Sequence, residues 1–187
     1  MVTKMSRAKH NSNTGINRQR GFSLIELLIV VAIILIIAAI AIPNLLRARM
    51  AANQASGAST IRTINSATIV YSSTYNNGFP PTFASMGGVG AANCNAANLL
   101  DDVLTTPPFH KSGYVYNYQP QGAPILNPPA ACGAPGFNEY LVTAVPIVVG
   151  NTGQASYCSD EPGVIRFDAT GVTAASVAAC EALPPLQ

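Results

Sequence analysis

The sequence GFSLIELLIVVAIILIIAAIAIPNL, residues 21–45, sets the architecture of this 187-residue chain. Between residues 22 and 42 only Ser23 and Glu26 are polar. At 1.5 Å per residue, a helix over these positions is about 31 Å long, which matches a hydrocarbon core of roughly 30 Å. The segment therefore predicts a helix that can cross a membrane.

Basic residues are concentrated in front of this segment. Residues 1–21 carry five basic side chains and no acid, whereas the rest of the chain carries five basic and eight acidic side chains. Positive charge marks the cytoplasmic flank of a membrane span, so we expect a cytoplasmic N-terminus and an extracytoplasmic domain over residues 76–187. That domain has two basic residues, Lys111 and Arg166, against seven acids. Direct binding of nucleic acid through its phosphates is therefore not expected.

The apolar segment has two ordinary interpretations. One is a secretory signal with a small-residue cleavage site at Ala39-Ile40-Ala41, and the other is a permanent single-span anchor. A carboxylate inside an apolar segment costs roughly 2.5 to 3.5 kcal/mol on insertion scales. Neither interpretation explains why Glu26 stands four residues after Phe22.

Two short sequences carry a more specific signal: GFSLIELLIVVAII at 21–34 and AIPNL at 41–45. They resemble the prepilin signature of type IV pilins and of the pseudopilins of type II secretion, and the resemblance extends over residues 18 to about 75. It implies that a prepilin peptidase cleaves after Gly21 on the cytoplasmic side and N-methylates the new N-terminus, Phe22. It also implies that Glu26 is the acidic fifth residue of the mature chain and that Pro43 is the helix-kinking proline, both serving assembly.

The position of Glu26 makes physical sense in that scheme. Cleavage after Gly21 would create an amine on Phe22 inside the same apolar layer, and intramembrane charges usually pair with one another. The pair can form within one helix, where residues four apart share a face, or between neighbouring chains. We favour the intermolecular pair, because staggered stacking would bury both charges in a filament core.

Beyond Pro43 the chain predicts a continued, amphipathic helix over residues 43–75. Pro43 lacks an N–H and clashes with the preceding turn, so a kink or locally melted stretch is expected around residues 39–43. An apolar stripe should pack on the following domain, and a polar set should face water or neighbouring subunits. The stripe is Ile61, Ile64, Tyr71 and Tyr75; the polar set is Arg47, Arg49, Gln54, Arg62 and Asn65. Asn76-Asn77-Gly78 and the prolines that follow predict the helix end.

The remaining residues, 76–187, predict a small β-rich domain. Residues 114–118 place three tyrosines on one face with a period of two, residues 139–149 are rich in β-branched side chains, and residues 164–167 form a short apolar run. These segments predict three or four antiparallel strands. The expected fold class is α+β, a long membrane-spanning helix packed on a small antiparallel sheet, which is also the α/β roll that the resemblance implies.

All four cysteines, Cys94, Cys132, Cys158 and Cys180, lie in the part placed outside the membrane, where disulfides persist. Two bridges with three possible pairings follow; free buried thiols are the alternative. We favour Cys94 with Cys132 and Cys158 with Cys180, because the second bridge would clamp the last strands and the tail, as in the disulfide-bounded C-terminal region of many pilins. The wide spacing argues against zinc.

Nothing in the sequence predicts a catalytic site, a metal site or a cofactor. His110 stands in a proline-rich loop without a nucleophile motif, and it is interpreted as a surface residue. Asp160, Glu161 and Asp168 could share a turn and ligate calcium, but we interpret them as solvated turn acids.

The resulting expectation is a structural protein rather than an enzyme: a filament subunit that is stored in the inner membrane as a single-span precursor. Its expected partners are the prepilin peptidase, the inner-membrane assembly machinery, the membrane and other copies of itself, in an extracellular or periplasmic filament. The alternatives are a type II secretion pseudopilin and, in a different class, a solitary anchored protein that binds a ligand through its tyrosine-rich sheet.

Overall fold

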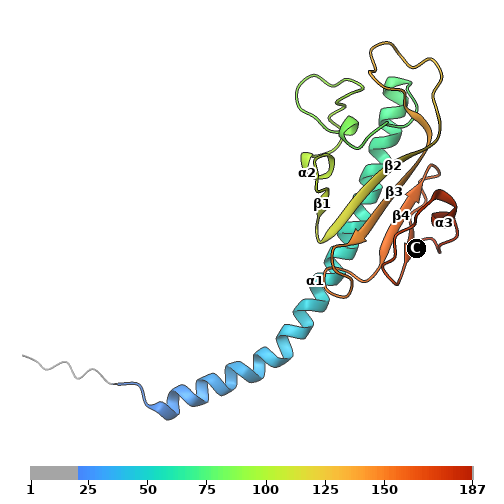
Figure 1. Ribbon diagram of the computed structural model, residues 1–187. Coiled ribbons are helices and arrows are strands. Elements are labelled where there is room, and N and C mark those ends of the chain that lie inside the picture. The colour runs from blue at the N-terminus through green and yellow to red at the C-terminus, as the bar shows by residue number, and fades with distance from the viewer. Residues whose placement is uncertain (1–20, 187) are drawn as a thin grey trace, which may run out of the picture. The chain divides into compact units, whose positions relative to one another are not determined.

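The computed structural model describes residues 21–186 (Figure 1), so the predicted leader, except for Gly21, lies outside the described residues. The described chain is α+β, as predicted. Its helices are α1 (Leu24–Tyr75), a 3-10 turn η1 (Ala84–Met86), α2 (Asp102–Thr105) and α3 (Val177–Glu181). Its strands are β1 (His110–Lys111), β2 (Tyr114–Pro124), β3 (Phe137–Pro146), β4 (Ser156–Asp160) and β5 (Arg166–Asp168).

The chain divides into two compact units between Ala41 and Ile42. This boundary lies inside α1. The C-terminal part of α1 belongs to the globular unit because its apolar stripe is buried there. The N-terminal part, by contrast, buries none of its large apolar side chains.

Helix α1 begins two residues after the predicted start and ends at Tyr75, the predicted position. It is continuous through Pro43, so the locally melted stretch expected over residues 39–43 is absent from the described helix. The missing N–H of Pro43 removes one helical hydrogen bond, but strong helix formers such as Ala39, Leu45 and Leu46 stand on both sides. Asn76, with a φ of 48°, adopts the left-handed conformation that ends helices.

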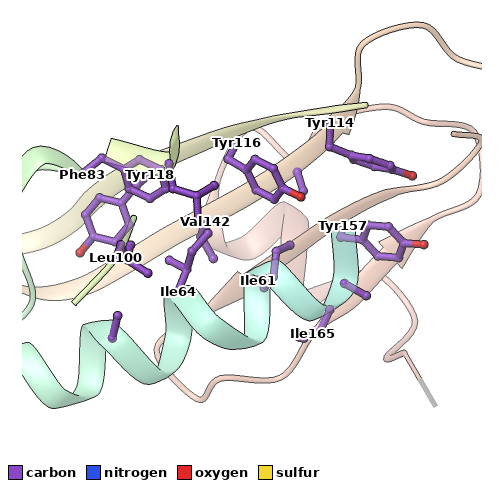
Figure 2. Packing of buried hydrophobic residues seen from close by; sticks show 14 of the residues in the cluster. Ile61, Ile64, Phe83, Leu100, Tyr114, Tyr116, Tyr118, Val142, Tyr157 and Ile165 are labelled. Atoms are coloured by element: carbon purple, nitrogen blue, oxygen red, sulfur yellow. The ribbon is translucent and has the colours of Figure 1, made fainter. Parts of the chain in front are cut away.

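The core lies between α1 and one face of the sheet. Figure 2 shows Ile61 and Ile64 of α1 pointing toward Tyr116 of β2 and Val142 of β3. The stripe predicted from helical spacing is buried, with Ile61, Ile64 and Tyr71 all at 0% exposure and Tyr75 partly covered.

The five strands form one antiparallel sheet in the order β1-β2-β3-β4-β5. Each strand pairs with the next along the chain, and the longest ladder joins β2 to β3, from Tyr114 opposite Pro146 to Pro124 opposite Phe137. The sheet exceeds the three or four strands predicted. β4 was missed because its sequence, SYCSD, is mostly polar, although every residue in it is buried. The three tyrosines of β2 share the core-facing side, as their period of two predicted.

One polar residue of α1 contradicts the sequence prediction. Asn65, expected to face water or a neighbouring subunit, is 6% exposed. Its side-chain nitrogen donates to Ser159 Oγ at 2.8 Å, and its oxygen accepts from the Tyr140 hydroxyl at 3.2 Å. Asn65 therefore joins α1 to the sheet through buried hydrogen bonds, an arrangement that helical periodicity alone cannot show.

Candidate functional site

The junction between Gly21 and Phe22 is exposed and lies before the helix begins. Residues 21–23 are not helical, and the backbone N–H of Leu27 donates to the carbonyl of Ser23 at 3.1 Å as the helix starts. A Cβ atom added to Gly21 would meet nothing within 4 Å. The packing of the described chain therefore does not require glycine at this position, and a requirement for glycine would have to come from a molecule that acts on the junction.

Glu26 lies in the first turn of α1, within the apolar segment. The partial positive charge of a helix N-terminus favours an acid there. Within residues 21–186 the one salt bridge joins Lys111 to Asp101, so no described cation pairs with Glu26. Phe22 precedes the helix, and its backbone nitrogen is part of a peptide bond in this uncleaved chain. A cation for Glu26 would therefore have to come from cleavage or from another molecule.

The N-terminal part of α1 presents an apolar surface with nothing packed on it. Phe22 is 72% exposed and Ile25 is 65% exposed, and the most apolar 18-residue window of α1 has no buried residue. A hollow of about 420 Å³ runs along this surface, lined at helical spacing by Leu24, Leu27, Leu28, Val31, Ala32 and Leu35. By length and composition the helix can cross a membrane, and contiguous exposed apolar surface of this size marks contact with lipid or protein.

The four cysteines form two disulfides, in the pairing that we favoured from the sequence. Cys94 and Cys132 join the loop after α1 to the loop between β2 and β3, with their Cα atoms 5.3 Å apart. The Tyr71 hydroxyl donates to the Cys94 carbonyl at 2.7 Å, so this bridge is anchored on the end of α1. Cys158 and Cys180 join β4 to α3, with Cα atoms 5.9 Å apart. The first bridge thus joins two loops, and the second ties the C-terminal helix to the sheet.

The candidate catalytic and metal residues do not converge. His110 is exposed on β1. The carboxylate of Asp168 accepts hydrogen bonds from the backbone and the hydroxyl of Thr170, which lowers its pKa. In the described part of the chain no three His, Cys, Asp or Glu side chains are arranged to hold a metal ion. Burial raises the pKa of the tyrosines at 114, 118 and 140, so these phenols stay neutral hydrogen-bond donors.

Asp160 is the second residue for which the structure contradicts the sequence interpretation. It was interpreted as a solvated turn acid, but it ends β4 and is 1% exposed. The signal that could have placed it is the period of two in a strand, because Asp160 is two residues beyond the disulfide-bonded, buried Cys158 and points to the same face.

The comparisons with known proteins single out the N-terminal segment. Residues 16–42 match the family described as the prokaryotic N-terminal methylation motif. Over 34 residues the chain is 71% identical to the type IV wide pilus major component PilA4 of Thermus thermophilus. The aligned region is 18% of this chain and 26% of that protein, so the match spans about a quarter of the relative. No solved structure matches the chain.

These findings confirm that the N-terminal segment resembles that of type IV pilins and carries a methylation motif. Together with the long apolar helix, they fit a membrane-anchored precursor and a pilin-like protein.

Proposed function

We propose that this chain is a structural subunit of a type IV pilus-like filament. The observation that carries the proposal is the combination, at one end of α1, of a methylation motif with an apolar surface that no described residue covers. Such a surface needs a lipid or protein environment, and a filament of identical subunits supplies the second. The chain's role is then assembly rather than catalysis.

Leader removal would switch the subunit from storage to assembly. A prepilin peptidase would cut the exposed bond between Gly21 and Phe22 and methylate the new amine. The methylated amine keeps its positive charge, so it can pair with the Glu26 carboxylate of a neighbouring subunit. In the membrane that carboxylate is costly, and the cost is offset when the two charges meet in the filament core.

The proposed topology follows from charge. Residues 1–21 stay in the cytoplasm, residues 22–42 cross the inner membrane, and the domain that follows lies outside. The two disulfides of the globular unit agree with an oxidising compartment. After assembly by inner-membrane machinery, the globular units would form the outer layer of an extracellular or periplasmic filament.

The central test compares Glu26→Ala with the wild type in a cell that carries type IV pilus assembly machinery. Glu26→Ala should still insert into the membrane, resist carbonate extraction and lack sheared extracellular filaments by electron microscopy. Asp102→Ala, which removes an exposed acid of the globular unit, is the matched control and should assemble. Normal filaments from Glu26→Ala would contradict the proposal.

The same experiment separates the alternatives. A type II secretion pseudopilin would be processed at Gly21 but remain in the envelope. A solitary anchored binding protein would form no filament, either as the wild type or as Glu26→Ala. Both proteins would insert into the membrane equally well.

A further inference from the structure

The sheet has a second face, turned away from α1. On β3 and β4 the side chains of Tyr140, Val142 and Tyr157 belong to the core, whereas Leu141 and Cys158 pack with Cys180 of α3 on the opposite side. Figure 1 shows α3 lying beside β4. A cavity of about 400 Å³ opens at this place, lined by Glu139, Tyr140, Asp160, Glu161, Pro162, Val177, Ala178 and Glu181.

The cavity gathers negative charge. Four of its eight lining residues are acids, which is half of the eight acids in the whole chain. They come from three elements and a turn: Glu139 from β3, Asp160 from β4, Glu161 from the turn after β4 and Glu181 from α3. None of the lining residues is basic. Carboxylates that share a site disfavour one another's charged form unless a cation lies among them.

Asp160 differs from the other three acids because it is buried and almost out of contact with solvent. Its side chain is almost fully buried, and neither carboxylate oxygen has a hydrogen-bond partner within residues 21–186. A buried carboxylate without a partner is costly. The nearest basic residue along the sheet, Arg166 on β5, donates from Nη1 to the Leu183 carbonyl at 2.9 Å and forms no ion pair with Asp160 within 4.0 Å.

The shape of the cavity indicates what kind of cation fits. A volume of about 400 Å³ is far larger than a bare ion, and the acids of the described chain are not arranged to hold a metal. A guanidinium or a primary ammonium group brings several N–H donors that can satisfy two carboxylate oxygens at once. We propose that this acidic cavity binds a guanidinium or primary ammonium group, whose charge Glu139, Glu161 and Glu181 surround and whose approach compensates the buried charge of Asp160.

Two sources of such a group exist. Arg47, Arg49 and Arg62 lie exposed on α1 and form no ion pair within the described residues. Another copy of this chain can therefore supply the group, and this source rests on the proposed filament function. A free polyamine is the other source, and it requires no filament.

The first arm of the test uses full-length protein kept monomeric in detergent micelles, titrated with ethylguanidinium and with spermidine by calorimetry. We expect saturable binding at one site, weakened at least tenfold by Asp160→Asn and severalfold by Glu181→Gln, which removes an exposed acid of the cavity without touching the core. Asp102→Asn, an exposed acid on α2, is the matched control and should bind like the wild type.

The same variants distinguish a binding site from an internal ion pair. If Asp160 lacks a partner, Asp160→Asn should raise the thermal unfolding midpoint of the free protein, since the buried charge is removed. A lowered midpoint would mean that Arg166 already pairs with Asp160, and it would overturn the proposal. Binding of calcium with no binding of either organic cation would overturn it as well.

The second arm uses sheared filaments and identifies the source. If a neighbouring copy supplies the group, Asp160→Asn filaments should dissociate at a lower salt concentration than wild-type filaments, and one of Arg47→Gln, Arg49→Gln or Arg62→Gln should reproduce this shift. Filaments unchanged by all four variants, together with binding in the first arm, assign the cavity to a free amine. No binding in the first arm and unchanged filaments in the second would overturn the proposal, and failure of the wild type to form filaments would count against the proposed function alone.

Discussion

Residues 24–42 and residues 57–71 belong to the same helix and are both rich in apolar side chains, but their surroundings are opposite. Ile33 in the first stretch is 53% exposed, whereas Ile64 in the second is fully buried against the sheet. The second stretch finds its partner within the chain. The first finds none among the described residues, so it has to be completed by lipid or by other subunits. The second stretch thus stabilises the globular unit, and in the proposed filament the first stretch serves assembly.

This division can be tested most strongly through the disulfides. The two disulfides close loops of 38 and 22 residues. Each disulfide should contribute about 3 to 4 kcal/mol to the free energy of unfolding of the globular unit. Replacing all four cysteines by alanine should make residues 42–187 sensitive to proteolysis while membrane insertion through residues 24–42 is unchanged. Limited proteolysis and carbonate extraction measure the two effects. Loss of both properties together would show that the two regions are not independent.

A matched pair of isoleucine substitutions sharpens the comparison. Ile64→Ala should lower the free energy of unfolding of the globular unit by about 2 to 5 kcal/mol, because it leaves a cavity in the core. Ile33→Ala should leave that free energy within about 0.5 kcal/mol and act on assembly instead. All seven tyrosines and no tryptophan lie in residues 42–187, so tyrosine fluorescence during urea unfolding in micelles reports on the globular unit alone. Equal effects of the two substitutions would contradict the division.

A smaller effect is expected where a polar group joins the helix to the sheet. Asn65→Ala removes the hydrogen bonds to Ser159 and Tyr140 and leaves their buried polar atoms without that partner. The expected loss is about 1 to 3 kcal/mol. Ser66→Ala, at the exposed neighbouring position, should change stability by less than about 0.5 kcal/mol. If the two variants unfold at the same urea concentration, the buried contact contributes nothing.

The smallest expected effect is a pH dependence of the globular unit. Desolvation raises the pKa of Asp160, and the charges of Glu181 and Glu161 act in the same direction, whereas the backbone of Asp160 and the Arg166 guanidinium lower it. Glu139 and Tyr140 also line the cavity. A carboxyl with a raised folded-state pKa favours the folded state below its unfolded-state value, and this contribution is lost as pH rises through the folded-state pKa. The free energy of unfolding of the wild type, relative to that of Asp160→Asn, should therefore increase as pH falls from 7. A difference that is flat, or that grows with pH, would mean that the carboxylate is paired.

Sequence reasoning succeeded where a pattern extends over many residues. The apolar run, the stripe that includes Ile61 and Ile64, and the asparagine and glycine after Tyr75 placed the long helix and its end, and the alternating tyrosines placed β2. It failed for Asn65, Asp160 and β4, because polar residues read as solvated unless the structure shows what surrounds them. The cavity beside α3 was also out of reach, since its four acids lie far apart along the chain and meet only through strand pairing and packing of the tail.

The most direct measurement of the central claim is the N-terminal mass of the protein recovered from sheared extracellular material and from the envelope. If the filament assembles through the apolar half of α1, the sheared fraction contains a chain that starts at a methylated Phe22. A chain that starts at Met1 in every fraction would mean a plain anchor, and one that starts at Ile42 would mean an ordinary secretory signal. Either result would contradict assembly through the apolar half of α1.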